Sequence, residues 1–305
     1  METFYRLHIA AFLIHAISSV LTFVFATNTG TRKILLEEFV FEGNTTRTDY
    51  VQIGESQDPI SWLHINEILT ALSHLYAILI YRNEVEYDSD VNEKESWRRT
   101  VEYTFTAGIL QVALLLGSGD VFIHDLLFVL GINALLQFVG YIIDQHDKDD
   151  TNIMKYYALG FGLLILELVY VVMHTVSIKM IDSKIEDIFG FLVLIGIFYF
   201  IFYVSFGILK LVGTDDEDVS RKYIILSVTT KISLSWMLIG NVYLGWEKHN
   251  ECASLSSDQY CNITGWSIFQ VIWIVFGCAG LLAVFWDNLK RLCRGNEYNQ
   301  VDSRV

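Results

Sequence analysis

The stretch Tyr223–Leu244 reads YIILSVTTKISLSWMLIGNVYL, and Lys231 is its single charged residue. The run is long enough to cross a bilayer, which takes about 20 mainly apolar residues. An ammonium group at the centre of such a helix costs at least about 2.5 kcal/mol relative to an apolar side chain. We therefore expect Lys231 to have a partner or a chemical use. One use that removes the problem is condensation of the amine with an aldehyde to give a Schiff base.

The composition places the whole chain in a membrane. Of its 305 residues, 53% are hydrophobic and 14% are aromatic, and Pro59 is the single proline. The apolar residues gather in blocks of about 20, whereas a soluble domain distributes them in shorter periodic runs. We predict an all-α membrane protein with eight spans, which cover Arg6–Ala26, Ile60–Tyr81, Trp97–Leu116, Val121–Ile143, Met154–Ile178, Ile188–Leu211, Tyr223–Trp246 and Trp266–Trp286.

The spans divide the chain into two parts. Residues 1–246 form a predicted seven-helix domain, in which residues 28–59 make an extended extracellular first loop with a candidate β-hairpin. Residues 247–305 add an outer loop, an eighth transmembrane helix and a short tail. The connection at residues 117–120 is so short that the third and fourth helices must be antiparallel neighbours.

Lysine and arginine residues predict the orientation of the chain. Placing the N-terminus in the cytoplasm assigns fourteen of the 21 to that side and six to the outside, and Lys231 is the one left within the membrane. Cytoplasmic loops carry an excess of these residues. We therefore predict a cytoplasmic N-terminus and, with eight spans, a cytoplasmic C-terminus.

Two sequons and two cysteines agree with this topology. Asn44 and Asn262 begin Asn-x-Thr sequons in loops that the prediction places outside, where glycosylation occurs. Cys252 and Cys261 lie in the same outer loop as the second sequon and are a candidate disulfide, because that compartment permits one. Each sequon alone is a weak signal, and their agreement is what supports the topology.

The net charge of −14 is spread over nearly all connections, which is typical of solvated loops. No basic patch is present, so we expect no nucleic-acid partner, and the expected surroundings are a lipid bilayer. The sequence also lacks zinc-ligand spacing, a Gly-rich phosphate loop and a nucleophile elbow. We therefore expect no metal site and no enzymatic activity. Any chemistry must come from polar residues inside the spans.

Glu102 is the first of these residues. It shares a helical face with Arg99, so a helix-end ion pair is one interpretation, and a counterion for Lys231 is the other. At 1.5 Å per residue, Lys231 lies about 14 Å and Glu102 about 6 to 8 Å from the cytoplasmic surface. Their side chains meet if the third and seventh spans pack together. Ser227, four residues before Lys231, either bonds these groups or bonds back to its own helix.

Histidines and further carboxylates occupy the same depth or the outer half. His15 and His74 fall near the level of Lys231, either as ordinary interhelical hydrogen bonds or as a pocket that accepts a proton, which Thr70 extends. Glu167 lies in the middle of the fifth span. It is either a neutral glutamate bonded to a neighbouring helix or, with Glu67 and His174, part of a proton path.

The pattern Arg99-x-x-Glu102-Tyr103, followed by Ser227-x-x-x-Lys231 and Trp236, resembles the heliorhodopsins. His15 and His74 stand where that family keeps its inner polar histidines. The long first loop and the N-in orientation are similar to the family as well. The resemblance covers about Met1–Trp246, and its motifs are specific in combination although each is short.

The resemblance implies a seven-helix bundle that binds all-trans-retinal as a protonated Schiff base on Lys231. Glu102 is then the counterion, Ser227 a hydrogen-bonding neighbour, and His15 and His74 part of the proton-accepting network. Tyr103, Trp236 and the aromatic run at residues 198–203 would line or flank the chromophore. The implied function is a photoreceptor with a signalling or regulatory output, with a homodimer and an unidentified signalling partner as implied assemblies.

Two departures leave alternatives open. The eighth helix lies beyond the usual seven and is a candidate dimer or partner contact. Glu167 is the second departure, and because some viral heliorhodopsins are thought to pass protons in light, a viral member acting as a light-gated proton channel or transporter through Glu102 and Glu167 is an alternative. A ligand-binding seven-helix receptor is the third hypothesis. It is disfavoured because the third span lacks an Asp-Arg-Tyr end and the seventh lacks Asn-Pro-x-x-Tyr.

Overall fold

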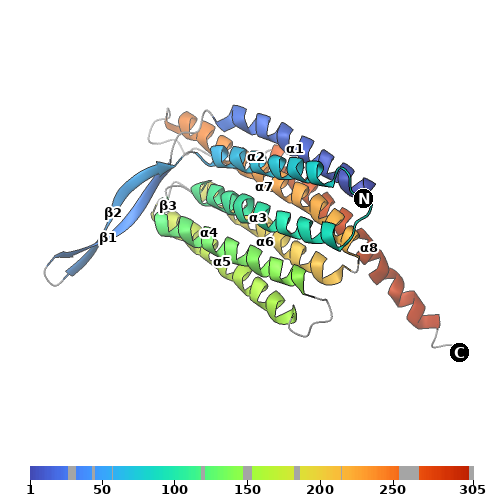
Figure 1. Cartoon of the computed structure of the whole chain (residues 1–305). Helices are drawn as coiled ribbons and strands as arrows, with labels where there is room; N and C mark the ends of the chain where they lie inside the picture. Colours follow the sequence, from blue (N-terminus) through green and yellow to red (C-terminus); the bar gives the residue numbers. More distant parts are fainter. Residues whose placement is uncertain are drawn as a thin grey trace.

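The computed structural model describes residues 1–26, 32–42, 45–56, 58–117, 121–146, 153–181, 186–213, 215–253 and 268–301. Within these residues, eight helices are long and apolar enough to cross a membrane, and they run roughly alongside one another in a bundle (Figure 1). The helices are α1 Glu2–Ala26, α2 Pro59–Tyr81, α3 Ser89–Gly117, α4 Ile123–Gln145, α5 Ile153–Ile181, α6 Glu186–Val212, α7 Asp216–Ala253 and α8 Ile268–Val301. The predicted eight-span, all-α membrane fold is confirmed.

Several helices are longer than the apolar blocks that predicted them. The helix α3 begins at Ser89 and not at Trp97, and α7 begins at Asp216 and not at Tyr223. Both extensions are polar, and their first turns carry acidic residues that suit a helix N-terminus. Hydropathy detects only the part of a helix that lies in lipid, so it misses such extensions.

The helices follow one another around the bundle, and α7 packs against α1, α2, α3, α6 and α8. It is the most buried of the candidate spans. Its buried surface is rich in small hydroxyl residues, which allow close helix contact in a membrane. These are Ser220, Ser227, Thr229, Thr230, Ser233 and Ser235. The central helix therefore carries Lys231 into the interior of the bundle.

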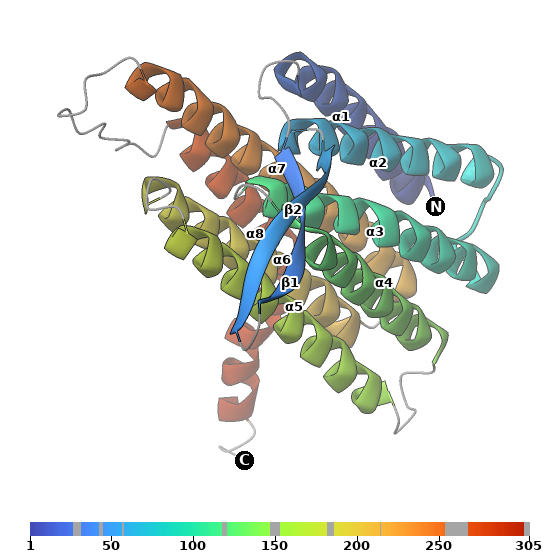
Figure 2. The same cartoon turned by 90° about the vertical axis from the view of Figure 1, so that its left-hand side faces the viewer.

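A β-hairpin extends from one end of the bundle (Figures 1 and 2). Its strands β1 Arg32–Glu42 and β2 Thr45–Ser56 pair antiparallel, with a register shift between Ile34 and Leu35. At that shift β1 also pairs in parallel with β3 Val121–Phe122. The candidate hairpin of the first loop is thus confirmed, and the fourth helix begins at Ile123 because Val121 and Phe122 join the sheet. We call this end of the molecule the hairpin side.

The eighth helix lies against α7 and α6. Two of its glycines allow the contact: a Cβ atom on Gly280 would lie 2.1 Å from Cγ2 of Thr229, and one on Gly277 would lie 2.7 Å from the ring of Phe202. Trp273 of α8 stacks on Trp236 of α7 with ring centroids 5.7 Å apart. The helix α8 is therefore fitted to the bundle, with its outer face left apolar.

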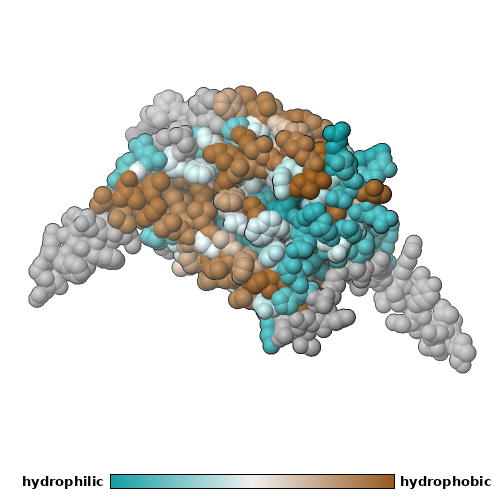
Figure 3. All heavy atoms as spheres, in the orientation of Figure 1, coloured by the Kyte–Doolittle hydropathy of each residue, from teal (hydrophilic) through white to brown (hydrophobic). Residues whose placement is uncertain are grey.

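The surface agrees with a bilayer position. Hydrophobic residues cover much of the helix bundle in the view of Figure 3, whereas hydrophilic residues gather toward the end where the N-terminus lies. Large apolar side chains are exposed along α1, α4, α5 and α8, as in helices that face lipid. The chain is an integral membrane protein by its composition and its helices.

Candidate functional site

Lys231 meets Glu102 in the interior of the bundle. Its Nζ atom makes an ion pair with Oε1 of Glu102 and donates a hydrogen bond to Oγ1 of Thr70, 3.1 Å away. The ring of Tyr103 lies beside the same atom, with its centroid 4.8 Å from Nζ. Lys231 and Glu102 are 5% and 6% exposed. The helices α2, α3 and α7 therefore enclose the amine that the sequence singled out.

Glu102 has a second cationic partner, Arg98. The Arg98 guanidinium donates to Oε2 of Glu102 and makes two bonds of 2.6 and 2.8 Å to the carboxylate of Glu95. Ser73 donates a further hydrogen bond of 2.8 Å to Glu102. One buried carboxylate thus lies between two positive groups, which is how a buried charge is stabilised.

Arg99 is directed away from Glu102, although the sequence suggested that these two residues share a face. It pairs with Asp144 at 3.1 Å, donates to Ser220 at 2.9 Å and lies over the ring of Tyr223. Tyr87, in the connection before α3, joins the same cluster through Ser220, and burial raises the pKa of its phenol. The helix-end ion pair therefore exists, but with Asp144 as its acid.

The histidines form two contacts on the α1 and α2 side of Lys231. His15 Nδ1 lies 2.6 Å from Oε2 of Glu67, and His8 Nδ1 lies 2.9 Å from Nδ1 of His74. The rings of His15 and His74 are nearly parallel, with centroids 6.0 Å apart. His8 also lies 3.7 Å from Glu95. A continuous group of buried titratable side chains therefore runs from Glu67 to Glu95.

On the opposite side of Lys231 lies a cavity of about 160 Å³. It is bordered by α3, α4, α5, α6 and α7 and is mainly apolar and aromatic. Its lining includes Tyr103, Leu110, Phe161, Leu164, Tyr203 and Phe206. A Cβ atom on Gly207 would lie 3.0 Å from the Phe161 ring, so this glycine leaves room for an aromatic wall. Lys231 therefore stands at the boundary between an apolar cavity and a polar network.

Three of the predicted neighbours lie at different distances from Lys231. Tyr103 is in contact with the amine and lines the cavity. Ser227 is buried near the hydroxyl group of Tyr103. Trp236 does not line the cavity; its indole donates to Ser18 at 3.1 Å and stacks on Trp273. Of the aromatic run at residues 198–203, the cavity is lined by Tyr203 alone.

Glu167 belongs to a separate cluster. Its carboxyl group accepts a 2.9 Å hydrogen bond from Tyr199, which accepts one from Gln111. His174, on the same helix, pairs with Asp125 of α4 at 2.8 Å, and Tyr170 also donates to Asp125. Glu67 lies with His15 on the other side of the bundle. The three residues proposed for one proton path therefore divide between two regions.

Four predicted modification residues lie outside the part of the chain described at side-chain level: Asn44, Asn262, Cys252 and Cys261. Among the described residues, no group of His, Cys, Asp or Glu side chains has the arrangement of a metal site.

Sequence reasoning missed several members of the network. Arg98 and Ser73 contact Glu102 directly, Glu95 joins the network through Arg98, and His8 extends the histidine group. Helical spacing could have indicated Arg98 and Glu95, because they lie four and seven residues before Glu102 on one face. Their position near the helix start instead suggested surface charges.

Comparison with known proteins places the chain in a family. The heliorhodopsin family model matches residues 4–243. The chain belongs to the heliorhodopsin family. A search of curated proteins found no match. The fold is similar to the crystal structure of the light-driven proton pump Coccomyxa subellipsoidea Rhodopsin CsR, with a TM-score of 0.57 and 11% sequence identity over 78% of this chain and 96% of that one. Heliorhodopsins bind retinal as their chromophore and are not in general enzymes.

The observed residues fit this cofactor. Retinal is an elongated apolar aldehyde, and its covalent attachment requires an amine at the wall of an apolar cavity. Lys231 is such an amine, and the aromatic cavity begins beside it. A positive charge at this depth requires a nearby carboxylate, which Glu102 supplies. The site therefore meets the three chemical requirements of the cofactor.

Proposed function

We propose that this heliorhodopsin is a light sensor in which all-trans-retinal is joined to Lys231 as a Schiff base, with Glu102 as counterion. The observation that carries the proposal is the buried Lys231–Glu102 ion pair at the edge of an apolar cavity. The retinal-binding domain lies within residues 1–246, and α8 is an addition to it.

The protein side chains have distinct roles in this proposal. The bound chromophore supplies light absorption and changes shape in light. Glu102 balances the positive charge at Lys231 Nζ, and Arg98 with Ser73 fixes the orientation of the carboxylate. Thr70 holds the Nζ atom from the other side. Ser227 is a hydrogen-bonding neighbour of the chromophore attachment, and His15 with His74 is part of the network that accepts the proton leaving Nζ.

The output that we propose is a change of bundle shape transmitted to a protein partner. Lys231 lies on the most buried helix, so its displacement affects the helices around it. The helix α8 packs against the same helix through Thr229 and Ser233. A homodimer or an unidentified signalling protein would then contact the altered surface. The observation that supports this output is the direct contact between α7 and α8.

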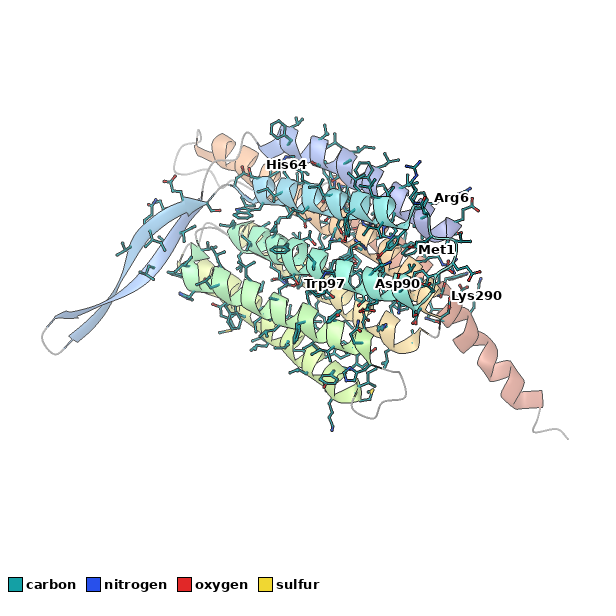
Figure 4. All side chains as sticks on the ribbon, viewed as in Figure 1. Met1, Arg6, His64, Asp90, Trp97 and Lys290 are labelled. Carbon is teal, nitrogen blue, oxygen red and sulfur yellow. The ribbon has the colours of Figure 1, made fainter. Side chains whose placement is uncertain are left out.

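We also propose that the N-terminus and the end of α8 are cytoplasmic. Met1, Arg6 and Lys290 lie at the end of the bundle opposite the hairpin, and His64 lies near the hairpin end (Figure 4). Fourteen of the 21 Lys and Arg residues belong to the former side in the eight-span topology. The positive-inside rule then favours a cytoplasmic location for that side.

The test is a spectrum recorded after expression with all-trans-retinal, beside Lys231→Ala. The wild type should show a visible band that Lys231→Ala abolishes. Lys222→Ala is the matched control, because Lys222 lies on the same helix but pairs with Asp218 at its polar end. A folded wild type without a visible band, or a band that survives in Lys231→Ala, contradicts the proposal.

A light-gated proton conductor is the second candidate function. The buried Gln111–Tyr199–Glu167 cluster favours it, because an ionisable group at such depth is commonly functional. Voltage-clamp recording of light-evoked current separates the two functions. Conduction predicts a photocurrent that Glu102→Gln and Glu167→Gln each abolish, whereas a sensor shows no steady photocurrent in the wild type.

A further inference from the structure

Glu67 and His15 form a buried acid–imidazole pair between α2 and α1. Both side chains are 0% exposed, and Oε2 of Glu67 lies 2.6 Å from Nδ1 of His15. A carboxylate at this depth needs a partner, because solvent cannot stabilise its charge. A single proton shared between the two groups leaves the pair neutral overall. If the proton is on Glu67, both groups are uncharged, and if it is on His15, the carboxylate and imidazolium charges cancel. The pair therefore balances its own charge.

Glu67 lies on the face of α2 that contacts Lys231. Glu67, Thr70 and His74 occupy positions i, i+3 and i+7 of α2, so they share one helical face. Thr70 contacts Nζ of Lys231 at 3.1 Å, which places Glu67 one helical turn from that contact. Lys231 interacts electrostatically with Glu67 as well as with Glu102. Besides Glu102, which contacts the amine, Glu67 is therefore a second carboxylate in its surroundings.

The two carboxylates differ in their ability to take a proton. Glu102 is held by Lys231, Arg98 and Ser73, so protonation would remove the negative charge that two buried cations require. Glu67 has no cation of fixed charge in contact within the described part of the chain. Its Oε1 atom and Nε2 of His15 also have no hydrogen-bond partner there. The pair therefore has free sites for a second proton.

Other buried titratable side chains continue from the pair toward Glu95. The His15 ring is stacked on His74, which contacts His8, which lies 3.7 Å from Glu95. The pair therefore adjoins two further buried imidazoles, of which His8 lies close to a second carboxylate. We propose that the Glu67–His15 pair is the first acceptor of the proton that leaves Lys231 Nζ in light, with Glu102 remaining ionised. This inference rests on the proposed function of Lys231 as the retinal attachment residue.

The first test uses the retinal-bound protein and flash spectroscopy. Glu67→Gln and His15→Gln should each keep the visible band in the dark but slow the light-induced loss of the Nζ proton roughly 100-fold, the usual effect of removing a proton acceptor. Glu67→Asp should restore most of the rate. The double variant should be no slower than the slower single variant, because the two groups act as a unit. Glu93→Gln, an exposed glutamate on α3, is the matched control.

The second test uses the retinal-free protein. An infrared titration with pH, compared between wild type and Glu67→Gln, isolates the carboxyl signal of Glu67. The groups that interact with the pair's neighbours His74 and Lys231 are His8 on α1 and Glu102 and Arg98 on α3. We expect the Glu67 signal to shift in His15→Gln and to change little in Glu93→Gln. A Glu67 signal that is unchanged in His15→Gln contradicts the coupling between the two residues.

Different results contradict the proposed retinal attachment at Lys231 and the proposed proton acceptor. A wild type without a visible band contradicts the role of Lys231, whatever the infrared titration shows. A visible band together with an unaltered proton-transfer rate in Glu67→Gln contradicts the acceptor role and leaves the retinal site intact. Glu67→Asp should keep most of the wild-type rate under the proposal, so the decisive comparison is between glutamine and aspartate at position 67.

Discussion

At the scale of single residues, the site is organised by charge balance around Glu102. Lys231 and Arg98 both pair with this carboxylate, and Arg98 also holds Glu95. Two buried cations and two buried carboxylates therefore compensate one another without solvent. Removing one member leaves an uncompensated charge, which in buried pairs typically costs about 3 to 5 kcal/mol. The conservative substitutions of Glu102 are thus informative about chromophore charge as well as stability.

Glu102→Gln should convert most of the bound chromophore to a form that absorbs in the near ultraviolet at neutral pH. The amide has the shape of the acid but no charge, so the proton at Lys231 Nζ loses its principal stabilisation. Absorption spectra from mildly acidic to alkaline pH measure this directly. Glu102→Asp is the control that keeps the charge. A visible band of wild-type intensity in Glu102→Gln at every pH would show that another residue is the counterion.

Single residues were predictable where their chemistry conflicts with their surroundings. Lys231 and Glu102 stand out because a charge in an apolar run is rare, and their depths could be counted from the helix start. Arg98 was not predictable in the same way, because a long side chain near a helix end usually reaches the surface. In this fold it instead turns inward between Glu95 and Glu102. The inward direction of this side chain depends on packing between helices, which the spacing of residues along one helix does not reveal.

At the scale of the elements, α8 is the feature that distinguishes this bundle. It lies directly behind the lysine-bearing helix, and its glycines admit the side chains of Thr229 and Ser233. Its predicted existence followed from hydropathy. Its docking surface did not, because a transmembrane helix that is apolar on all sides has no periodic stripe to indicate which face is buried.

Gly280→Ala should destabilise the protein by about 1 to 3 kcal/mol, the usual cost of overpacking. The new Cβ atom would lie 2.1 Å from Thr229 Cγ2 and 2.7 Å from Thr229 Cβ, so a rotamer change alone does not relieve the contact and α8 must move. The measurement is the rate at which the visible band is lost on heating in detergent. Gly162→Ala on α5 is the matched control, because its Cβ would meet nothing within 4 Å. Equal thermal loss in the two variants would mean that α8 is not closely packed against α7.

The hairpin, like α8, was predictable as an element but not in its contacts. Its presence in the long first loop was anticipated, but its attachment was not. The register shift at Ile34 and Leu35 lets β1 pair with Val121 and Phe122, residues that read as the start of an apolar helix. Two strand residues are too few to produce a period-two pattern. The sheet therefore ties the first loop to the short α3–α4 connection in a way that only the assembled chain reveals.

At the scale of the whole molecule, the interior is divided by α7 into two compartments. The polar network with Glu67, His15 and Glu95 lies toward α1, α2 and α3, whereas the apolar cavity lies toward α4, α5 and α6. Hydropathy predicted the number of helices, and the alternation of the chain predicted their antiparallel order. The division itself arises because polar residues from different helices share one side, which is a property of the bundle and not of any one span.

The orientation of the bundle is the last prediction, and it concerns the entire molecule. In intact cells, a membrane-impermeant maleimide should label Ile53→Cys, an exposed hairpin position, but not Glu93→Cys, an exposed position at the start of α3. Permeabilisation should make Glu93→Cys reactive. The expectation follows from the excess of Lys and Arg at the end opposite the hairpin. The wild type, which has four native cysteines, gives the background to subtract. Labelling of Glu93→Cys alone in intact cells would reverse the orientation, and would direct the polar network of Glu95 and Arg98 toward the outside.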